Sequence, residues 1–181
     1  MSLIKSISGI RGTIGGKPGD NLTPLDAVKF AAAYGTWLKN EHKNDKLKVV
    51  IGRDARISGA MVQQLVMNTL VGLGIDVVDL GLSTTPTVEV AVAMEKANGG
   101  IILTASHNPK QWNALKLLND KGEFLNGEEG AKILEYAENE NFNFAEVDNL
   151  GKIIPIEDYI DRHIEEVLKL KLVDVEAIKN A

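Results

Sequence analysis

The amino-acid sequence predicts an α/β fold: a three-layer α/β/α sandwich in which helices cover both faces of a mostly parallel mixed sheet. Two observations support this prediction. Short runs of aliphatic and β-branched residues, typical of buried strands, alternate along the chain with longer segments whose apolar residues recur at helical spacing. The helical segments span about 12 to 16 residues, which is enough to cross over between parallel neighbours.

Composition and charge indicate a folded domain. The 181 residues are 44% hydrophobic and 25% charged, which suits a single domain with its own core. The formal net charge of −5 predicts no general attraction to nucleic acid or to an anionic membrane. Cysteine is absent, which excludes a disulfide framework or a thiolate metal site. With neither a signal-peptide pattern nor an apolar run that could span a bilayer, a cytoplasmic location is expected.

The first strand is expected over residues 3–8 and leads into a glycine-rich loop over residues 9–19. This loop has some of the glycines of a phosphate-binding P-loop. However, Arg11 stands where the first glycine belongs, and Pro18 stands where a Ser or Thr would hold magnesium. We therefore reject a P-loop here.

The first helix has a well-marked beginning. Thr23 and Pro24, followed by Asp26, predict an N-cap, a proline at the first helical position and a carboxylate placed as in a capping box. The next strand, residues 47–51, leads into a polar turn and a second helix.

The polar turn, residues 52–59, reads G-R-D-A-R-I-S-G and allows two interpretations. In the structural interpretation, an Arg-Asp ion pair stabilises the turn and Ser58 caps the following helix. In the functional interpretation, Arg53 lies in the active site. We assign the structural, supporting role to Asp54 and Arg56. For Arg53, a structural role and a place in the active site both remain open.

The remaining elements continue the alternation of strands and helices. A strand over residues 75–80 precedes a helix from about residue 84 to 96. Towards the C-terminus we expect a helix that begins at Gly127, a polar loop over residues 139–148 and an amphipathic helix over residues 156–168.

The central stretch, residues 104–116, reads T-A-S-H-N-P-K-Q-W-N-A-L-K and follows a buried strand over residues 100–104. Asn108-Pro109 favours a turn, after which a strand resumes over residues 114–118. Because the connection is too short for a crossover helix, the two strands are expected to be antiparallel neighbours. Ser106 is then presented at the C-terminal end of a buried strand, where open α/β sheets bind ligands.

Ser106 is a candidate nucleophile or phosphate carrier. His107 is adjacent and Lys116 lies in the returning strand, and a phosphoserine needs such charge-assisted donors. A neighbouring Ser-His pair is more often only part of a loop, so other functions stay open. The chain could be a serine hydrolase, although the absence of G-x-S-x-G disfavours this, or a non-catalytic domain that serves in binding or assembly.

Three motifs, in order, resemble the first domain of the α-D-phosphohexomutase superfamily. Residues 8–12 resemble its G-I-R-G signature, and residues 52–59 resemble G-R-D-x-R-x-S-G. T-A-S-H-N-P, with Lys116 ten residues after Ser106, resembles its active-site serine loop. The superfamily includes phosphoglucomutases, phosphomannomutases and phosphoglucosamine mutases. Ala114 departs from the pattern, because many members have glycine there.

The resemblance implies a reversible phosphoryl transfer between the 1- and 6-positions of a hexose phosphate, through a phosphoserine and a hexose 1,6-bisphosphate. Ser106 would carry the phosphoryl group and, through its phosphate, bind Mg²⁺ as one ligand. Lys116 would act as general acid/base or as a cation in the transition state, and Arg11 would contact phosphate. His107 would orient groups or handle protons, while Asn108 would bind phosphate or hold the loop.

The resemblance also implies a domain division. Residues 1–155 would form domain I, and residues 156–181 a linker helix and the start of a truncated second domain. The acidic magnesium loop and the sugar-recognition loop belong to the remaining three domains of an intact chain. An isolated fragment is therefore expected to be inactive, and the alternative function for it is a non-catalytic sugar-phosphate binding module. The serine loop favours phosphoglucosamine mutase, with phosphomannomutase and phosphoglucomutase as alternatives.

Overall fold

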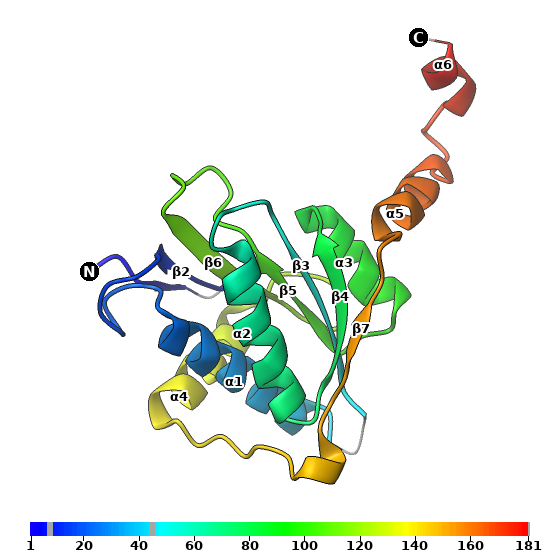
Figure 1. The fold of residues 1–181 in the computed structure, drawn as a ribbon. Helices are drawn as coiled ribbons and strands as arrows, with labels where there is room; N and C mark the ends of the chain where they lie inside the picture. The colour runs from blue at the N-terminus through cyan, green and yellow to red at the C-terminus, as the bar shows by residue number, and fades with distance from the viewer. Residues whose placement is uncertain (7–8, 44–45, 181) are drawn as a thin grey trace.

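The computed structural model describes residues 1–6, 9–43 and 46–180. These residues form one seven-stranded sheet in the order β1-β2-β6-β5-β3-β4-β7, shown in Figure 1. The strands are β1 (Ile4–Ser6), β2 (Gly9–Thr13), β3 (Lys48–Arg53), β4 (Asp76–Leu82), β5 (Gly99–Leu103), β6 (Trp112–Leu118) and β7 (Ile153–Pro155). The helices are α1 (Pro24–Glu41), α2 (Gly59–Gly72), α3 (Thr85–Met94), α4 (Gly127–Asn139), η1 (Val147–Asn149), α5 (Tyr159–Leu168) and α6 (Val175–Lys179).

The sheet is mixed, as predicted. Strands β5, β3, β4 and β7 are parallel to one another. Strands β1, β2 and β6 add antiparallel pairings at the other side. The predicted antiparallel pairing of β5 and β6 is confirmed, with Ile101 opposite Leu117.

Helices cover both faces of the sheet, which confirms the three-layer α/β/α class. The core on one face joins side chains of α1, α2 and α4 to the sheet. The core on the other face is smaller and joins side chains of α3 and α5 to the sheet. The predicted beginning of α1 is confirmed, because Thr23 and Asp26 form a capping box.

Several local predictions need correction or extension. Residues 9–13, expected as part of a loop, form strand β2, so the antiparallel part of the sheet is larger than predicted. The first strand is observed over Ile4–Ser6, while Ile7 and Ser8, which the prediction included, lie outside the described residues. Strand β7 and helix α6 were not predicted, and the last amphipathic helix begins at Tyr159 rather than at residue 156.

Helix α5 is attached to α3 by polar contacts. The buried Tyr159 donates its hydroxyl to Glu95 Oε1 at 2.7 Å, and His163 Nδ1 lies 3.0 Å from Thr87 Oγ1. The apolar stripe of α5 does not take part in the contact between α5 and the rest of the domain. Its members are all exposed, namely Ile160, Ile164, Val167 and Leu168.

This attachment should depend on pH. The hydroxyl of Tyr159, together with Lys48 and Arg162, lowers the pKa of Glu95 below its ordinary value. Because the pKa is lower in the folded state, the ionised Glu95 stabilises the fold near neutral pH. That contribution is lost as the pH falls below the ordinary carboxyl pKa and through the folded-state pKa.

We therefore expect Glu95→Gln to lower the melting temperature near neutral pH and to match wild type in acid. Glu89→Gln is a control that should raise the melting temperature near neutral pH. Burial raises the pKa of Glu89, so its ionisation near neutral pH lowers the stability of the fold. Thermal unfolding across this pH range measures both differences. A Glu95→Gln difference that stays constant with pH would contradict the assignment.

Candidate active site

An open pocket of about 450 Å³ lies at the C-terminal end of β5. It brings together every site residue predicted from the sequence: Arg11, Ser106, His107, Asn108 and Lys116. Ser106, His107 and Arg11 are exposed, whereas Asn108 and Lys116 are partly buried. The pocket is therefore a place where a solvent-borne ligand can meet a hydroxyl, an imidazole and two cations.

Strand register accounts for the positions of the two cations. Ile10 of β2 and Leu115 of β6 are paired, and both belong to the core beneath α1, α2 and α4. Because side chains alternate along a strand, Arg11 and Lys116 project from the opposite face. On that face α3 packs over β3 and β5. The adjoining part of the face, over β2 and β6, is left open and forms the pocket.

The serine loop begins where β5 ends and is held in an uncommon conformation. Ser106 has a φ of +54°, in the left-handed region that residues other than glycine seldom adopt. Its backbone N–H donates to Thr104 Oγ1 at 3.0 Å, and the N–H of Asn108 donates to Ala105 O at 3.0 Å. These bonds turn the chain sharply, which leaves the Ser106 side chain exposed at the rim of the pocket.

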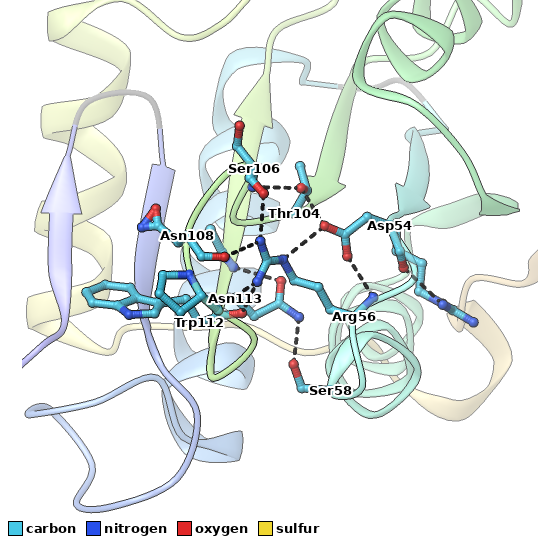
Figure 2. A network of polar contacts seen from close by, with 11 residues as sticks. Asp54, Arg56, Ser58, Thr104, Ser106, Asn108, Trp112 and Asn113 are labelled. Atoms are coloured by element: carbon cyan, nitrogen blue, oxygen red, sulfur yellow. Dashed lines mark hydrogen bonds and ion pairs between the residues drawn. The ribbon is translucent and has the colours of Figure 1, made fainter.

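A polar network underneath the loop, drawn in Figure 2, connects it to the turn after β3. Arg56 Nε donates to Asp54 Oδ2 at 3.0 Å, so the predicted Arg-Asp ion pair is confirmed with Arg56 as the cation. Thr104 Oγ1 donates to the same carboxylate oxygen at 2.6 Å. Ser58 occupies the expected N-cap position of α2, but its side chain forms no cap bond, and Ser58 Oγ instead accepts from Asn113 Nδ2 at 2.9 Å.

Arg53, whose role the sequence left open, lies outside the pocket lining. Its Nε donates to Gln63 Oε1 at 2.8 Å, and Gln63 in turn donates to Asp79 Oδ1 at 2.6 Å. These contacts favour the structural interpretation, in which Arg53 ties the end of β3 to α2 and β4.

The positive charge of Lys116 has two neighbours. Its Nζ lies 5.7 Å from the centroid of the Phe124 ring, a cation–π distance. Burial raises the pKa of the Glu89 carboxyl, and the nearby charge of Lys116 opposes that rise. Among the described residues, neither Lys116 nor Arg11 belongs to an ion pair. Both charges are therefore available to an anion.

The pocket lining also includes residues that were not predicted as site residues, namely Ser6, Gly9, Ile10, Thr104, Ala105, Ala114 and Leu115. Ser6 and Gly9 line the pocket from β1 and β2, and Ser6 Oγ donates to Gly9 O at 2.8 Å. A prediction that residues 9–13 pair with β6 would have placed Gly9 opposite Lys116, and Ser6 is placed by the further pairing of β1 with β2.

The described fold and pocket define a class of protein: an α/β/α domain that presents a serine hydroxyl and two unpaired cations at the C-terminal end of a strand. The model of the family phosphoglucomutase/phosphomannomutase, alpha/beta/alpha domain I, matches residues 3–144. The chain belongs to this family and corresponds to its domain I.

Individual comparisons agree. A phosphoglucomutase/phosphomannomutase of Thermococcus kodakarensis is 39% identical over 170 residues, covering 93% of this chain and 36% of the relative. A phosphoglucosamine mutase of Nautilia profundicola is 35% identical over 153 residues, covering 84% of this chain and 34% of the relative. The crystal structure of a phosphoglucomutase/phosphomannomutase family protein from Burkholderia thailandensis has the same fold, with a TM-score of 0.76 at 23% identity, covering 94% of this chain and 36% of that one. The chain thus spans about a third of the length of its relatives.

The described residues contain neither a candidate membrane span nor a cluster of candidate metal ligands. No helix in the ranges 1–6, 9–43 and 46–180 is long and apolar enough to cross a membrane. Within the same ranges, no three His, Asp or Glu side chains converge as a metal site would require.

Proposed function

We propose that this chain is the catalytic-serine domain of a phosphohexomutase, which interconverts hexose 1-phosphate and hexose 6-phosphate through a phosphoserine and a hexose 1,6-bisphosphate. One observation carries the proposal: the exposed Ser106 shares an open pocket with Arg11 and Lys116, whose charges are free of ion pairs among the described residues. A phosphoserine carries about −1.5 to −2 charges and is stabilised by such cations.

Each pocket residue has a proposed role. Ser106 carries the phosphoryl group, and Arg11 contacts phosphate with its guanidinium fork. Lys116 serves as general acid/base or neutralises charge in the transition state. His107 orients groups or handles protons, and Asn108 contributes to phosphate binding while it holds the loop.

The proposed transfer exchanges one phosphorus–oxygen bond for another. The bond from phosphorus to Ser106 Oγ breaks as a bond forms to a hydroxyl oxygen of the hexose phosphate. That hydroxyl gives up its proton, and Ser106 Oγ gains one, with Lys116 or His107 handling the protons. The resulting bisphosphate then returns its other phosphoryl group to Ser106 by the reverse exchange. Catalysis of this kind depends on positioning and charge neutralisation.

The pocket could supply only part of a magnesium site. A phosphate on Ser106 could supply one oxygen ligand, but none of the described residues lining the pocket is acidic. Magnesium prefers an octahedral set of oxygen ligands. The residues of this chain do not form such a set by themselves, so the remaining ligands would have to come from the rest of a longer enzyme.

The domain would work within a longer cytoplasmic enzyme. In this proposal residues 1–155 form domain I, and residues 156–181 lead into the remaining three domains. Two observations support it: the greater length of the relatives and the exposed apolar stripe of α5. The isolated chain would then bind hexose phosphates without completing the mutase cycle. We favour glucosamine phosphate as substrate, with mannose and glucose phosphates as alternatives, since the relatives carry these names.

Binding of hexose 1,6-bisphosphate tests the pocket. We expect Arg11→Gln and Lys116→Met each to weaken binding about tenfold or more, because each removes a charge-assisted contact worth about 1.5 to 3 kcal/mol. Isothermal titration calorimetry measures the dissociation constants.

Lys110→Gln is the matched control for this experiment. It removes the same charge from the serine loop at a residue outside the pocket lining, so the affinity should be nearly unchanged. If Lys110→Gln weakened binding as much as Lys116→Met, the bisphosphate would be responding to overall charge and the pocket assignment would be wrong.

A further inference from the structure

The guanidinium of Arg56 occupies the space beneath the serine loop, and its side chain is only 11% exposed. Nη2 donates to Ser106 O at 2.7 Å and to Asn108 O at 2.9 Å. Nη1 donates to Pro109 O at 3.0 Å and to Trp112 O at 3.1 Å. With Nε bound to Asp54, every N–H group of the guanidinium has an acceptor.

The acceptors span the whole connection between β5 and β6. They are backbone carbonyls, so Arg56 fixes the path of the loop independently of the side chains that the loop carries. Figure 2 shows that the guanidinium lies between the loop and Asp54. Arg56 and Asp54 do not line the pocket, so any effect that they have on a bound ligand passes through the loop.

Asp54 extends this control to Ser106 itself. Its Oδ1 accepts the backbone N–H of Arg56 at 3.0 Å, which fixes the carboxylate in the turn. Its Oδ2 accepts from Thr104 Oγ1, and Thr104 Oγ1 accepts the backbone N–H of Ser106. The peptide units on both sides of Ser106 are therefore bound: its N–H through Thr104 and its C=O by Arg56.

The conformation so held is costly by itself. A residue other than glycine in the left-handed region has a strain of about 1 to 3 kcal/mol and persists only where its surroundings determine it. Ser106, with its φ of +54°, is in this situation. A lysine at position 56 could not replace the clamp, because an ammonium lacks the planar fork that reaches several separate carbonyls.

We propose that Arg56 is a positioning residue that, with Asp54 and Thr104, holds the serine loop in its left-handed conformation and so presents the Ser106 hydroxyl to the pocket. The effect of Arg56 on phosphoryl transfer rests on the proposed function, whereas its effect on the loop conformation does not. The two are therefore measured separately.

Backbone amide hydrogen exchange followed by NMR tests the effect on the loop. In Arg56→Ala and Arg56→Lys, the amides of Ser106 and Asn108 should exchange about tenfold faster or more, since each lost bond to a charged donor is worth at least that factor. Exchange of buried strand amides, such as that of Ile101, should change far less. Unchanged exchange at Ser106 and Asn108 in both variants would overturn the proposal.

Arg53→Ala is the matched control. It removes the same group from the same turn, but its bonds go to Gln63 and to Asp54 O, away from the serine loop. It should leave loop exchange as in wild type. A similar acceleration in Arg53→Ala would assign the effect to general loosening of the turn and would also overturn the proposal.

Chemical rescue of Arg56→Ala tests whether the guanidinium group itself holds the loop. Millimolar guanidinium should slow loop exchange again in Arg56→Ala, whereas methylammonium should not. With hexose 1,6-bisphosphate as donor, the rate of Ser106 phosphorylation in Arg56→Ala should fall, while the dissociation constant of the bisphosphate changes little.

If wild type accepts no phosphoryl group, the proposed function fails, and loop exchange still decides the role of Arg56. Failure of guanidinium to restore protection would count against that role.

Discussion

Replacement of Ser106 by alanine should abolish transfer of a phosphoryl group from hexose 1,6-bisphosphate to this chain. Alanine removes the only side-chain oxygen at that position, so no phosphorus–oxygen bond can form there. The cations of the pocket would remain, and binding of the bisphosphate should persist. Intact-mass spectrometry of wild type and Ser106→Ala, after incubation with the bisphosphate, measures the loss.

Two further variants make this test specific. Ser6→Ala removes another hydroxyl that lines the same pocket, and it should leave phosphoryl transfer nearly unchanged. Ser106→Gly also removes the hydroxyl, but it accepts the positive φ of this position without strain. Retention of phosphoryl transfer in Ser106→Gly would show that another residue is the acceptor.

Replacement of Gly9 by alanine should destabilise the domain severely. Gly9 has a φ of +141°, and an added Cβ would lie 2.2 Å from the carbonyl oxygen of Leu115 and 3.0 Å from the Cα of Lys116. Both are backbone atoms of the paired strand β6, so they cannot move aside cheaply. We expect a loss of about 3 kcal/mol or more, against a total stability of about 5 to 15 kcal/mol for such domains. Urea unfolding measures the change.

Gly19→Ala separates the effect of conformation from that of the clash. Gly19 also has a positive φ, +82°, but nothing lies within 4 Å of the added Cβ. Its loss should be about 1 kcal/mol, the usual penalty for a left-handed alanine. Equal losses in the two variants would mean that the contact between β2 and β6 is looser than described.

Much of the fold could be predicted because its determinants are local. The capping box at Thr23 and Asp26 depends on residues three positions apart. The antiparallel pairing of β5 and β6 followed from the short connection between them. The predicted pocket residues Ser106, His107 and Lys116 also lie close in sequence, on that one hairpin.

The rest depends on contacts between distant parts of the chain. Residues 9–13 contain two glycines and were predicted as a loop, yet β2 forms because β6 offers it a partner about a hundred residues away in the sequence. The reach of Arg56 to the serine loop is of the same kind, with separations of 50 to 56 residues. Local patterns do not contain such information. They suggested an ion pair with Asp54 but not the carbonyls bound beyond it.

The residue that receives the phosphoryl group decides whether Ser106 is the phosphate carrier of this domain. Wild-type chain incubated with hexose 1,6-bisphosphate would be digested, and its phosphopeptides mapped by tandem mass spectrometry. We expect a single phosphorylated position, Ser106, within the peptide that contains T-A-S-H-N-P. A phosphoryl group found at Ser6, His107 or another residue while Ser106 stays unmodified would contradict this expectation.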